Sequence, residues 1–358
     1  GGCTWNPTVL GQKFTSTAEM ASGGAIHVGV ANSCGSQCPD NDVKIYRSDD
    51  NAMTFPVSAN PGILNDWWQS MQVAKSDPDR VYVSSYRFVN NVPPMMGTHR
   101  EHYLYRSNDQ GATFVPMSIT GITVGEDSAM HIAGISPTNP DIVFLRVDYE
   151  NGVIGDGIYR SVDGGQSWTK VFQKQDSLNA FVVRANGDVV VAAPALGGSV
   201  STNCKTTTDA CTFTELQGEP HLSCLAENEA GGVWGCTQNF GGNQLPGDGY
   251  GIMKTTDLAT WTGVLRYQDI KAPLACPVGT VQTDVCSVDV WCAMRSQLGL
   301  TSTAIECPVI KLDGASPDGQ LTVDPRPKGC CDVGSEGLPG LLGVAGIVGL
   351  ALMRRRKV

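Results

Sequence analysis

One short pattern recurs along the chain and constrains its fold more than any other feature. A serine, an aspartate two positions later and an aromatic residue five positions after the aspartate occur three times, each time directly after a Tyr-Arg pair. Two weaker copies begin with threonine. The five aspartates are Asp50, Asp109, Asp163, Asp209 and Asp257, at intervals of 59, 54, 46 and 48 residues. This regular spacing predicts a structural unit of about 50 residues that is copied along the chain.

Each copy has the chemistry of a tight turn between two strands. The aspartate accepts hydrogen bonds from backbone N–H groups of the turn, and a glycine adopts the positive φ that such turns need. The final aromatic residue is expected to fill the space between neighbouring sheets. Because a catalytic group has no reason to recur in every unit, the aspartates and the arginines before them (Arg47, Arg106 and Arg160) are predicted to be structural.

A second motif keeps the same period. Ser76–Val83 matches Ser136–Phe144, and shorter forms occur at 184–190 and 227–234. Each is a polar turn that leads into a strand of β-branched and aromatic residues. Repeats of several short strands predict an all-β fold, a β-propeller of about six four-stranded blades over residues 1–310, with five or seven also compatible.

The ends of the repeat region carry two further expectations. The closing blade is predicted to join residues 264–310 to a strand at Thr4–Thr17, because a closed ring leaves no sheet edge exposed. A short helix is predicted at Ser287–Gln297, where apolar residues recur at helical spacing.

The pattern Ser-x-Asp-x-Gly-x-Thr-Trp resembles the Asp-box, also called the BNR repeat, of sialidase-like propellers. A sialidase implies three arginines that bind a carboxylate, a tyrosine nucleophile with a glutamate partner, and an acid/base aspartate. The Arg-Ile-Pro or Arg-Leu-Pro tripeptide of sialidases is absent from the sequence. We therefore predict a ligand-binding or scaffold module for a glycan or a protein, with a sialidase-like glycoside hydrolase as the alternative.

Acidic residues precede the predicted innermost strand of most units. They are Asp66, Asp127, Asp176, Glu219 and Asp269, with His221 near Glu219 and Tyr267 near Asp269. A ring of carboxylates would suit Ca²⁺ or a basic or polyol ligand, whereas acids also favour turns before strands for purely local reasons. Asp66 and Asp127 are the nominal catalytic pair of a hydrolase. No metal site is assigned, and no cofactor other than Ca²⁺ is suggested.

The aromatic pair Trp67-Trp68 is a candidate ligand surface. Consecutive residues of a strand point to opposite faces, so one of the two rings is expected to lie away from the core. Together with Tyr86, Phe88 and the His99–Tyr103 loop, that ring would form a surface for sugar stacking. The longer irregular loop Arg87–Tyr103 is expected to cover one face of the propeller. Ordinary core packing of these rings is the alternative.

Thirteen cysteines predict disulfides. Cys224 and Cys236 flank a predicted hairpin, and Cys204 and Cys211 bracket a short loop, so we predict one disulfide within each pair. Zinc is disfavoured because the chain contains no CxxC pair. Disulfides indicate an oxidising compartment outside the cytoplasm. The pairing of seven other cysteines is left open: Cys3, Cys34, Cys38, Cys276, Cys286, Cys292 and Cys307.

Charge and the C-terminal tail indicate the location of the protein. The net charge of −10 disfavours a nucleic-acid partner. Residues 311–329 are rich in Pro, Gly and Asp and are predicted to be a linker. Leu338–Met353 is uncharged, would form an apolar helix of about 24 Å, and precedes the basic cluster Arg354–Lys357, so residues 330–358 are predicted to anchor the chain in a membrane.

The tail also resembles a known sorting signal. Cys330-Cys331, the apolar stretch and the terminal arginines are similar to the myxobacterial MYXO-CTERM type. That resemblance implies cleavage near the cysteines, lipid attachment at Cys330 or Cys331, and display at the cell surface. Gly1–Thr4 has neither a basic nor an apolar region, so we expect the chain to begin after a cleaved signal peptide.

Overall fold

The computed structural model describes most of the chain up to residue 300. The described residues are 8–10, 13, 15–31, 43–62, 66–90, 97–125, 128–148, 155–242, 245–280, 282–295, 298 and 300. They belong to two compact units, one of Thr8–Arg266 and one that includes the described residues from Tyr267 onward. The predicted linker, apolar helix and lipidated cysteines (Cys330 and Cys331) lie outside the described residues, as do Asp127, Cys3, Cys34, Cys38 and Cys307.

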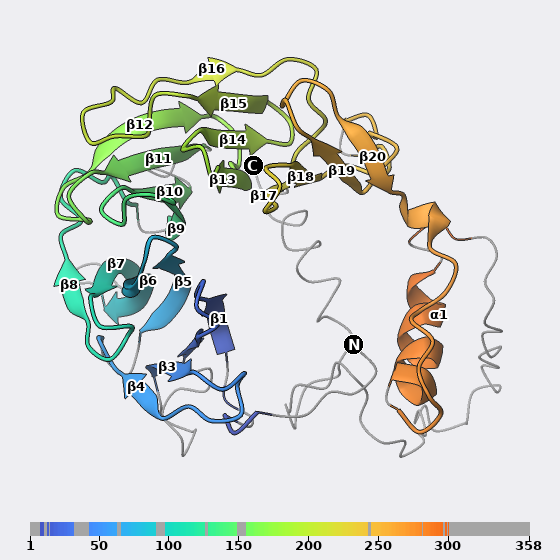
Figure 1. Ribbon diagram of the computed structural model, residues 1–358, viewed down its shortest axis with the longest axis horizontal. Helices are drawn as coiled ribbons and strands as arrows, with labels where there is room; N and C mark the ends of the chain where they lie inside the picture. Colours follow the sequence, from blue (N-terminus) through green and yellow to red (C-terminus); the bar gives the residue numbers. More distant parts are fainter. Residues whose placement is uncertain are drawn as a thin grey trace. The chain divides into compact units, whose positions relative to one another are not determined.

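The Thr8–Arg266 unit contains five four-stranded antiparallel sheets in its described part (Figure 1). The first sheet consists of β1 (Thr15–Met20), β2 (Ile26–Val30), β3 (Lys44–Ser48) and β4 (Val57–Ala59). The second consists of β5 (Trp67–Ala74), β6 (Asp77–Asn90), β7 (Thr98–Ser107) and β8 (Val115–Met117). The third consists of β9 (Ala129–Ile135), β10 (Val143–Asp148), β11 (Asp156–Ser161) and β12 (Thr169–Lys174). The fourth consists of β13 (Ala180–Val183), β14 (Val189–Ala193), β15 (Gly197–Ser201) and β16 (Thr214–Glu215). The fifth consists of β17 (Cys224–Glu227), β18 (Val233–Cys236), β19 (Ile252–Thr255) and β20 (Thr262–Leu265).

Within every sheet the strand order follows the chain, and consecutive sheets meet through their first strands. β1 contacts β5, β5 contacts β9, β9 contacts β13, and β13 contacts β17. Apolar layers fill the space between neighbouring sheets, with Ile45 and Trp68 in the first layer and Leu104 and Leu145 in the second. Four-stranded meanders packed face to face through their first strands are the blades of a β-propeller, so the predicted all-β fold is confirmed.

The described residues form five sheets, which is within the predicted range of five to seven blades. The predicted closing blade of residues 264–310 and Thr4–Thr17 lies largely outside the described residues. Within them, Thr15–Thr17 belong to β1, which opens the first sheet and pairs with β2. After β20 the described chain forms η3 (Tyr267–Asp269), η4 (Gln282–Val290) and α1 (Trp291–Met294). The predicted helix at 287–297 overlaps these helical turns. Apolar residues recur there every three to four positions, as in a helix, and do not alternate with polar residues as in a strand.

The aspartate turns join the third and fourth strands of their sheets. In the third sheet, Asp163 Oδ1 accepts the Ser161 hydroxyl at 2.8 Å and the Ser167 N–H at 3.0 Å. The first two turns repeat these bonds at Asp50 and Asp109. Hydrogen bonds from the Thr54 hydroxyl and N–H and from Ser48 lower the pKa of Asp50 to about 2. These aspartates thus make the hydrogen bonds to their own turns that the turn chemistry predicts.

The fourth turn corrects the assignment of Asp209. The residue that occupies the aspartate position is Asn203, whose Oδ1 accepts the Ser201 hydroxyl at 2.9 Å and the Thr212 N–H at 2.8 Å. Asp209 instead accepts the N–H groups of Lys205 and Thr206 inside an insertion. The insertion brought a second aspartate turn of its own, which the repeat pattern mistook for the equivalent one. Asp257 in the fifth sheet is equivalent, and bonds from Thr260, Ala259 and Thr255 lower its pKa to about 2.

The arginines before the first three turns connect each of these sheets to the one that follows. Arg47 donates to the Gln110 carbonyl at 3.5 Å, and Arg106 donates to the Gly164 carbonyl at 2.8 Å. Arg160 donates to the Asp209 carbonyl at 2.9 Å. In each case the acceptor belongs to the turn region of the following sheet. The predicted structural role of these three arginines is therefore confirmed.

Both predicted disulfides are present. Cys204–Cys211 closes the insertion of the fourth sheet, with Cα atoms 4.3 Å apart. Cys224–Cys236 joins β17 to β18 at directly opposed positions, with Cα atoms 4.9 Å apart. Cys276 and Cys292 are also disulfide-bonded. Among the described helices, none has the length and hydropathy needed to span a membrane.

Candidate functional site

Asp66 lies immediately before β5 and is fully buried. Its carboxylate receives two bonds from Arg87 of β6, at 2.6 and 3.0 Å, and one from the Tyr105 hydroxyl of β7, at 3.3 Å. Gly62 is needed beside it, because a Cβ there would lie 1.7 Å from Asp66 Oδ2. Asp66 therefore holds Arg87 in place, and the Arg87 guanidinium stacks 3.8 Å from the Tyr103 ring centroid.

The other predicted acids make local bonds to the backbone. Asp176 accepts the N–H groups of Ser177 at 2.8 Å and Ala195 at 3.1 Å. Glu219 accepts the Gly198 N–H at 2.6 Å. These bonds fix the segments that lead into β13 and β17. This matches the alternative in which the acids stabilise turns locally and do not form a ring of carboxylates. In the described part of the chain, no group of three or more His, Cys, Asp and Glu side chains could hold a metal ion.

The remaining predicted polar residues lie apart from Asp66 in the sequence and in their contacts. His221 Nδ1 is 2.8 Å from Asp248 Oδ1, and the His221 N–H also points to that carboxylate. Asp248 additionally accepts the Gln238 N–H at 2.8 Å, so this pair ties together the loops around the fifth sheet. Tyr267 and Asp269 form part of η3 in the other compact unit.

The two tryptophans at the start of β5 occupy different environments. Trp68 is only 2% exposed, donates its Nε1–H to the Val30 carbonyl at 3.0 Å, and packs edge-on against Tyr105. It is a core residue, so its prediction as a ligand contact is wrong. Trp67 lies on the opposite face, where it is partly exposed and stacks against Tyr86 at 6.5 Å with an interplanar angle of 14°.

Trp67 belongs to a larger aromatic surface. Tyr86 contacts Phe88 edge to face at 5.5 Å, and Phe88 is 49% exposed. The guanidinium of Arg100 lies 4.9 Å from the Tyr86 centroid and 5.5 Å from the Phe88 centroid. We call Trp67, Tyr86, Phe88 and Arg100 the aromatic surface. An apolar platform of rings flanked by a cation can contact both the hydrophobic face and the polar groups of a ligand.

A long hairpin carries this surface, where the sequence predicted an irregular loop. β6 and β7 pair from Val81 with Ser107 to Asn90 with Thr98, so most of Arg87–Tyr103 is strand. The pairing sets Tyr86 opposite His102 and Phe88 opposite Arg100. Alternation of apolar and polar residues through Phe88 was the signal for this strand, and the Pro- and Gly-containing centre of the segment obscured it.

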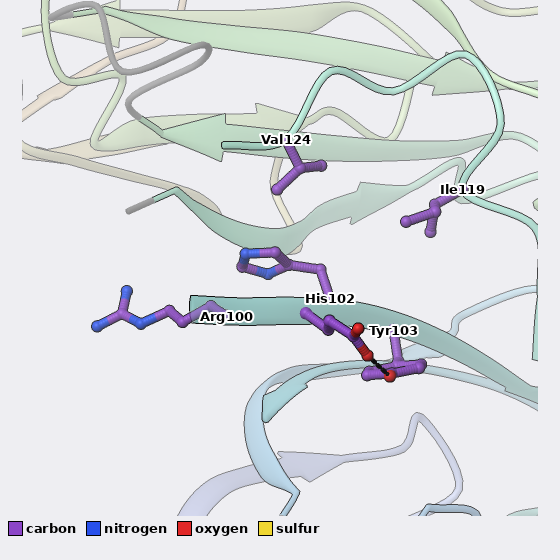
Figure 2. Close-up of a pocket in the computed structure, with 6 residues that line it drawn as sticks. Arg100, His102, Tyr103, Ile119 and Val124 are labelled. Carbon is purple, nitrogen blue, oxygen red and sulfur yellow. Dashed lines mark hydrogen bonds between the residues drawn. The ribbon is translucent and has the colours of Figure 1, made fainter. Parts of the chain in front are cut away.

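A cavity of about 270 Å³ lies beside the same hairpin. Its lining residues are Arg100, Glu101, His102, Tyr103, Ile119 and Val124. Figure 2 shows His102 on the side of β7 that faces Ile119 and Val124, with Tyr103 on the other side. The sequence analysis included Arg100 and His102 only as members of the His99–Tyr103 loop, and the strand pairing places both on the face of Tyr86 and Phe88.

His102 is the most unusual residue of this cavity. It is 7% exposed, and the Gly125 backbone is the one described group placed to bond its ring, outside good hydrogen-bond geometry. Burial, together with the nearby charge of Arg100, lowers the pKa of His102 to about 4, against the opposing effect of that bond with the Gly125 backbone. The imidazole is therefore neutral at neutral pH and keeps one donor and one acceptor.

A second cavity of about 440 Å³ lies on the fifth sheet. Trp234 and Lys254 are directly opposed on β18 and β19, and the ammonium lies 5.6 Å from the indole centroid. Threonines and Asp257 complete the lining. No short sequence pattern indicates this cavity, because its residues come together only through the register of the strands.

Comparison with known proteins shows sequence similarity over short segments and does not assign the chain to a family. No model of a protein family matches the chain. A xyloglucanase, Xgh74A of Acetivibrio thermocellus, is 30% identical over 107 residues, which is 29% of this chain and 11% of the relative. A xyloglucanase of Hypocrea jecorina is 27% identical over 124 residues, 34% of this chain and 14% of the relative. The chain thus spans a small part of the length of either relative.

Solved structures give a similar picture. The GH74 xyloglucanase of Xanthomonas campestris has a TM-score of 0.47 at 16% identity, over 75% of this chain and 39% of that one. YCF48 bound to a D1 peptide has a TM-score of 0.43 at 11% identity, over 73% of this chain and 69% of that one. At such scores these neighbours assign neither an activity nor a ligand to the protein.

Proposed function

We propose that the protein is an exported, cell-surface-anchored Asp-box propeller that binds a glycan through the aromatic surface. The observation that carries this proposal is the cluster of Trp67, Tyr86 and Phe88, in which Trp67 is parallel to Tyr86 and Phe88 meets Tyr86 edge to face, with Phe88 half exposed and Arg100 beside it. Flat aromatic faces match the apolar C–H faces of sugar rings, and a guanidinium supplies donors for hydroxyl oxygens.

The ion pair behind the surface supports a binding role. Asp66 and Arg87 tie the start of β5 to β6, next to the rings of Trp67 and Tyr86. A platform that is rigid before the ligand arrives loses less conformational freedom on binding, which favours affinity. Binding by a preformed surface therefore needs no rearrangement of this hairpin.

A glycoside hydrolase is the alternative, favoured by the local likeness to xyloglucanases. Most such enzymes need a general acid and a second carboxylate across the scissile bond. Asp66 is buried and engaged by Arg87 and Tyr105, which supports a structural role. Release of reducing sugar from xyloglucan, abolished in Asp66→Ala and Asp127→Ala proteins that remain folded, would instead establish the hydrolase.

Export and anchoring are supported by different observations. The two disulfides of the fourth and fifth sheets suit an oxidising compartment. The Asp-box assignment rests on the repeated turn chemistry of Asp50, Asp109 and Asp163. Mass spectrometry of the mature C-terminus should find lipid at Cys330 or Cys331, and an intact Arg-rich end in surface fractions would contradict the anchor.

The binding proposal is tested with purified protein and an array of oligosaccharides that includes xyloglucan, arabinan and sialylated fragments. Trp67→Ala and Phe88→Ala should each weaken binding about tenfold, the loss expected for one stacking contact of about 1.4 kcal/mol. Phe240→Ala is the matched control, because Phe240 is 44% exposed and lies between β18 and β19 of the fifth sheet. Binding that is unaffected by the first two variants, or lost equally in the control, would refute the aromatic surface as the site.

A further inference from the structure

The outer edge of β7 is left open over part of its length. β7 pairs with β6 over ten positions, but β8 covers only Leu104–Arg106. Among the described residues, no strand pairs with the outer edge of Arg100–Tyr103. Half of the backbone N–H and C=O groups of an edge strand point away from its sheet, so this edge offers main-chain partners to another strand.

The 270 Å³ cavity runs along this edge. Four consecutive residues of β7 line it, although neighbouring side chains of a strand point to opposite faces. A cavity can touch both faces only where it lies against the edge of the strand. Ile119 and Val124 line it on the His102 side of β7 (Figure 2). The cavity is therefore bounded by the edge of β7 and, on the His102 side, by apolar side chains.

Two observations argue against an edge that is merely protected by charge. A protective charge faces open water, whereas the His102 side of this edge is covered by Ile119 and Val124. His102 is also buried there, and only the Gly125 backbone is placed to bond one ring nitrogen, so the other is left without a partner among the described residues, which is costly unless something bonds to it. An occupant with polar main-chain or side-chain groups would supply the missing partner.

The charges of the edge define the occupant further. Arg100 and His102 lie on one face of β7, and Glu101 and Tyr103 lie on the other. The side chain of Glu101 is 47% exposed and accepts a hydrogen bond from the Tyr103 hydroxyl. A strand placed beside β7 would thus meet a cation on one face and a carboxylate on the other, at successive positions.

We propose that the Arg100–Tyr103 edge of β7 binds an extended peptide segment of a partner protein by strand addition. The peptide lies in line with β8, pairs through its main chain, and carries an acidic residue beside Arg100 and a basic residue beside Glu101. Its polar groups reach His102, and its apolar residues contact Ile119 and Val124. This is a protein-binding site in addition to the proposed glycan surface, and it does not depend on glycan binding.

The test uses fluorescein-labelled hexapeptides and the full chain in fluorescence polarisation. Because β8 is antiparallel to β7, the residue beside Glu101 precedes the one beside Arg100, so Thr-Val-Lys-Asp-Val-Thr is the matching probe and Thr-Val-Asp-Asp-Val-Thr is the mismatched one. The wild-type protein should bind the matching probe at least about fivefold more tightly, in line with about 1 kcal/mol for an opposite-charge cross-strand pair. Glu101→Lys should reverse this order, and Glu101→Gln should abolish the preference while keeping a polar partner for Tyr103.

Main-chain pairing is tested separately with two methylated versions of the matching probe. One carries N-methyl groups on its odd residues and the other on its even residues. Since only alternate N–H groups face β7, one version should bind and the other should not. Absence of binding by the matching probe, equal affinity of both methylated versions, or an unchanged order in Glu101→Lys would each overturn the proposal. None of these outcomes bears on glycan binding, which is measured with the Phe88 variant.

Discussion

Acidification should destabilise the fold well before the aspartate turns are protonated, and His27 gives the sharpest prediction. His27 of β2 is fully buried, and neither of its ring nitrogens has a hydrogen-bond partner in the described structure. It packs against the second aspartate turn, where a Cβ on Gly111 would lie 3.2 Å from Nδ1. Burial and the charge of Arg47, opposed by Asp49, lower the pKa of His27 from 6.5 to about 4.

The sign and size of the effect follow from linkage. Because the pKa is lower in the folded state, the folded protein resists protonation and the unfolded chain does not. Stability is therefore complete above the unfolded pKa and is lost as the pH falls from about 6.5 toward 4. For His27 alone this amounts to about 2 kcal/mol between pH 7 and pH 5. His102 and His131 have similarly lowered pKa values, so they act in the same direction.

The assay is urea unfolding followed by tryptophan fluorescence at pH 7, 6 and 5, with disulfides intact. The free energy of unfolding of His27→Leu should fall between pH 7 and pH 5 by about 2 kcal/mol less than that of the wild type. Val28→Ala, in the same strand, is the control, and should lower stability equally at all three pH values. If His27→Leu and the wild type lose the same stability on acidification, the buried-histidine reasoning is refuted.

Four other outcomes are expected. Asp66→Asn should cost about 3 kcal/mol in urea unfolding, since it leaves Arg87 without its ionised partner, and an unchanged midpoint would contradict the buried ion pair. Asp163→Ala should cost about 1–2 kcal/mol by removing several turn bonds, as measured by the same unfolding midpoint. Cys224→Ser combined with Cys236→Ser should lower the free energy of unfolding by about 3 kcal/mol, the loss expected for a disulfide that closes a loop of this length, and calorimetry would detect the lower Tm. EDTA should leave the Tm unchanged, whereas a marked fall would point to a bound cation of the kind the ring of acids suggested.

The repeat could be predicted because its chemistry is local. Serine, aspartate and the final aromatic residue lie within one turn, so the pattern appears in the sequence wherever the turn appears in the fold. Asp209 shows the limit of this logic, since an insertion placed a second aspartate turn beside Asn203. Residue types alone do not distinguish the turn that joins two strands from the turn inside the insertion.

The candidate site could be predicted only in part. The alternation of side chains along a strand correctly predicted that Trp67 and Trp68 lie on opposite faces. Only the packing of Trp68 against Val30 shows which ring is buried. The partner of Asp66 was likewise out of reach, because Arg87 is 21 residues away and is selected by the pairing of β5 with β6. Long-range register decides both contacts, and no short pattern encodes it.

The arginines that link neighbouring sheets have a consequence for how such a molecule can change in evolution. The second sheet shows both halves of the linkage: its third strand donates from Arg106 to the Gly164 carbonyl, and its own turn accepts from Arg47 at the Gln110 carbonyl. A duplicated unit brings both halves of this joint with it, so insertion or loss of a unit leaves the adjoining ones compatible. Lys254 occupies the corresponding place in the fifth sheet and lies over Trp234. Because the donor lies on one sheet and the acceptor on the following sheet, the linkage has a fixed direction along the chain.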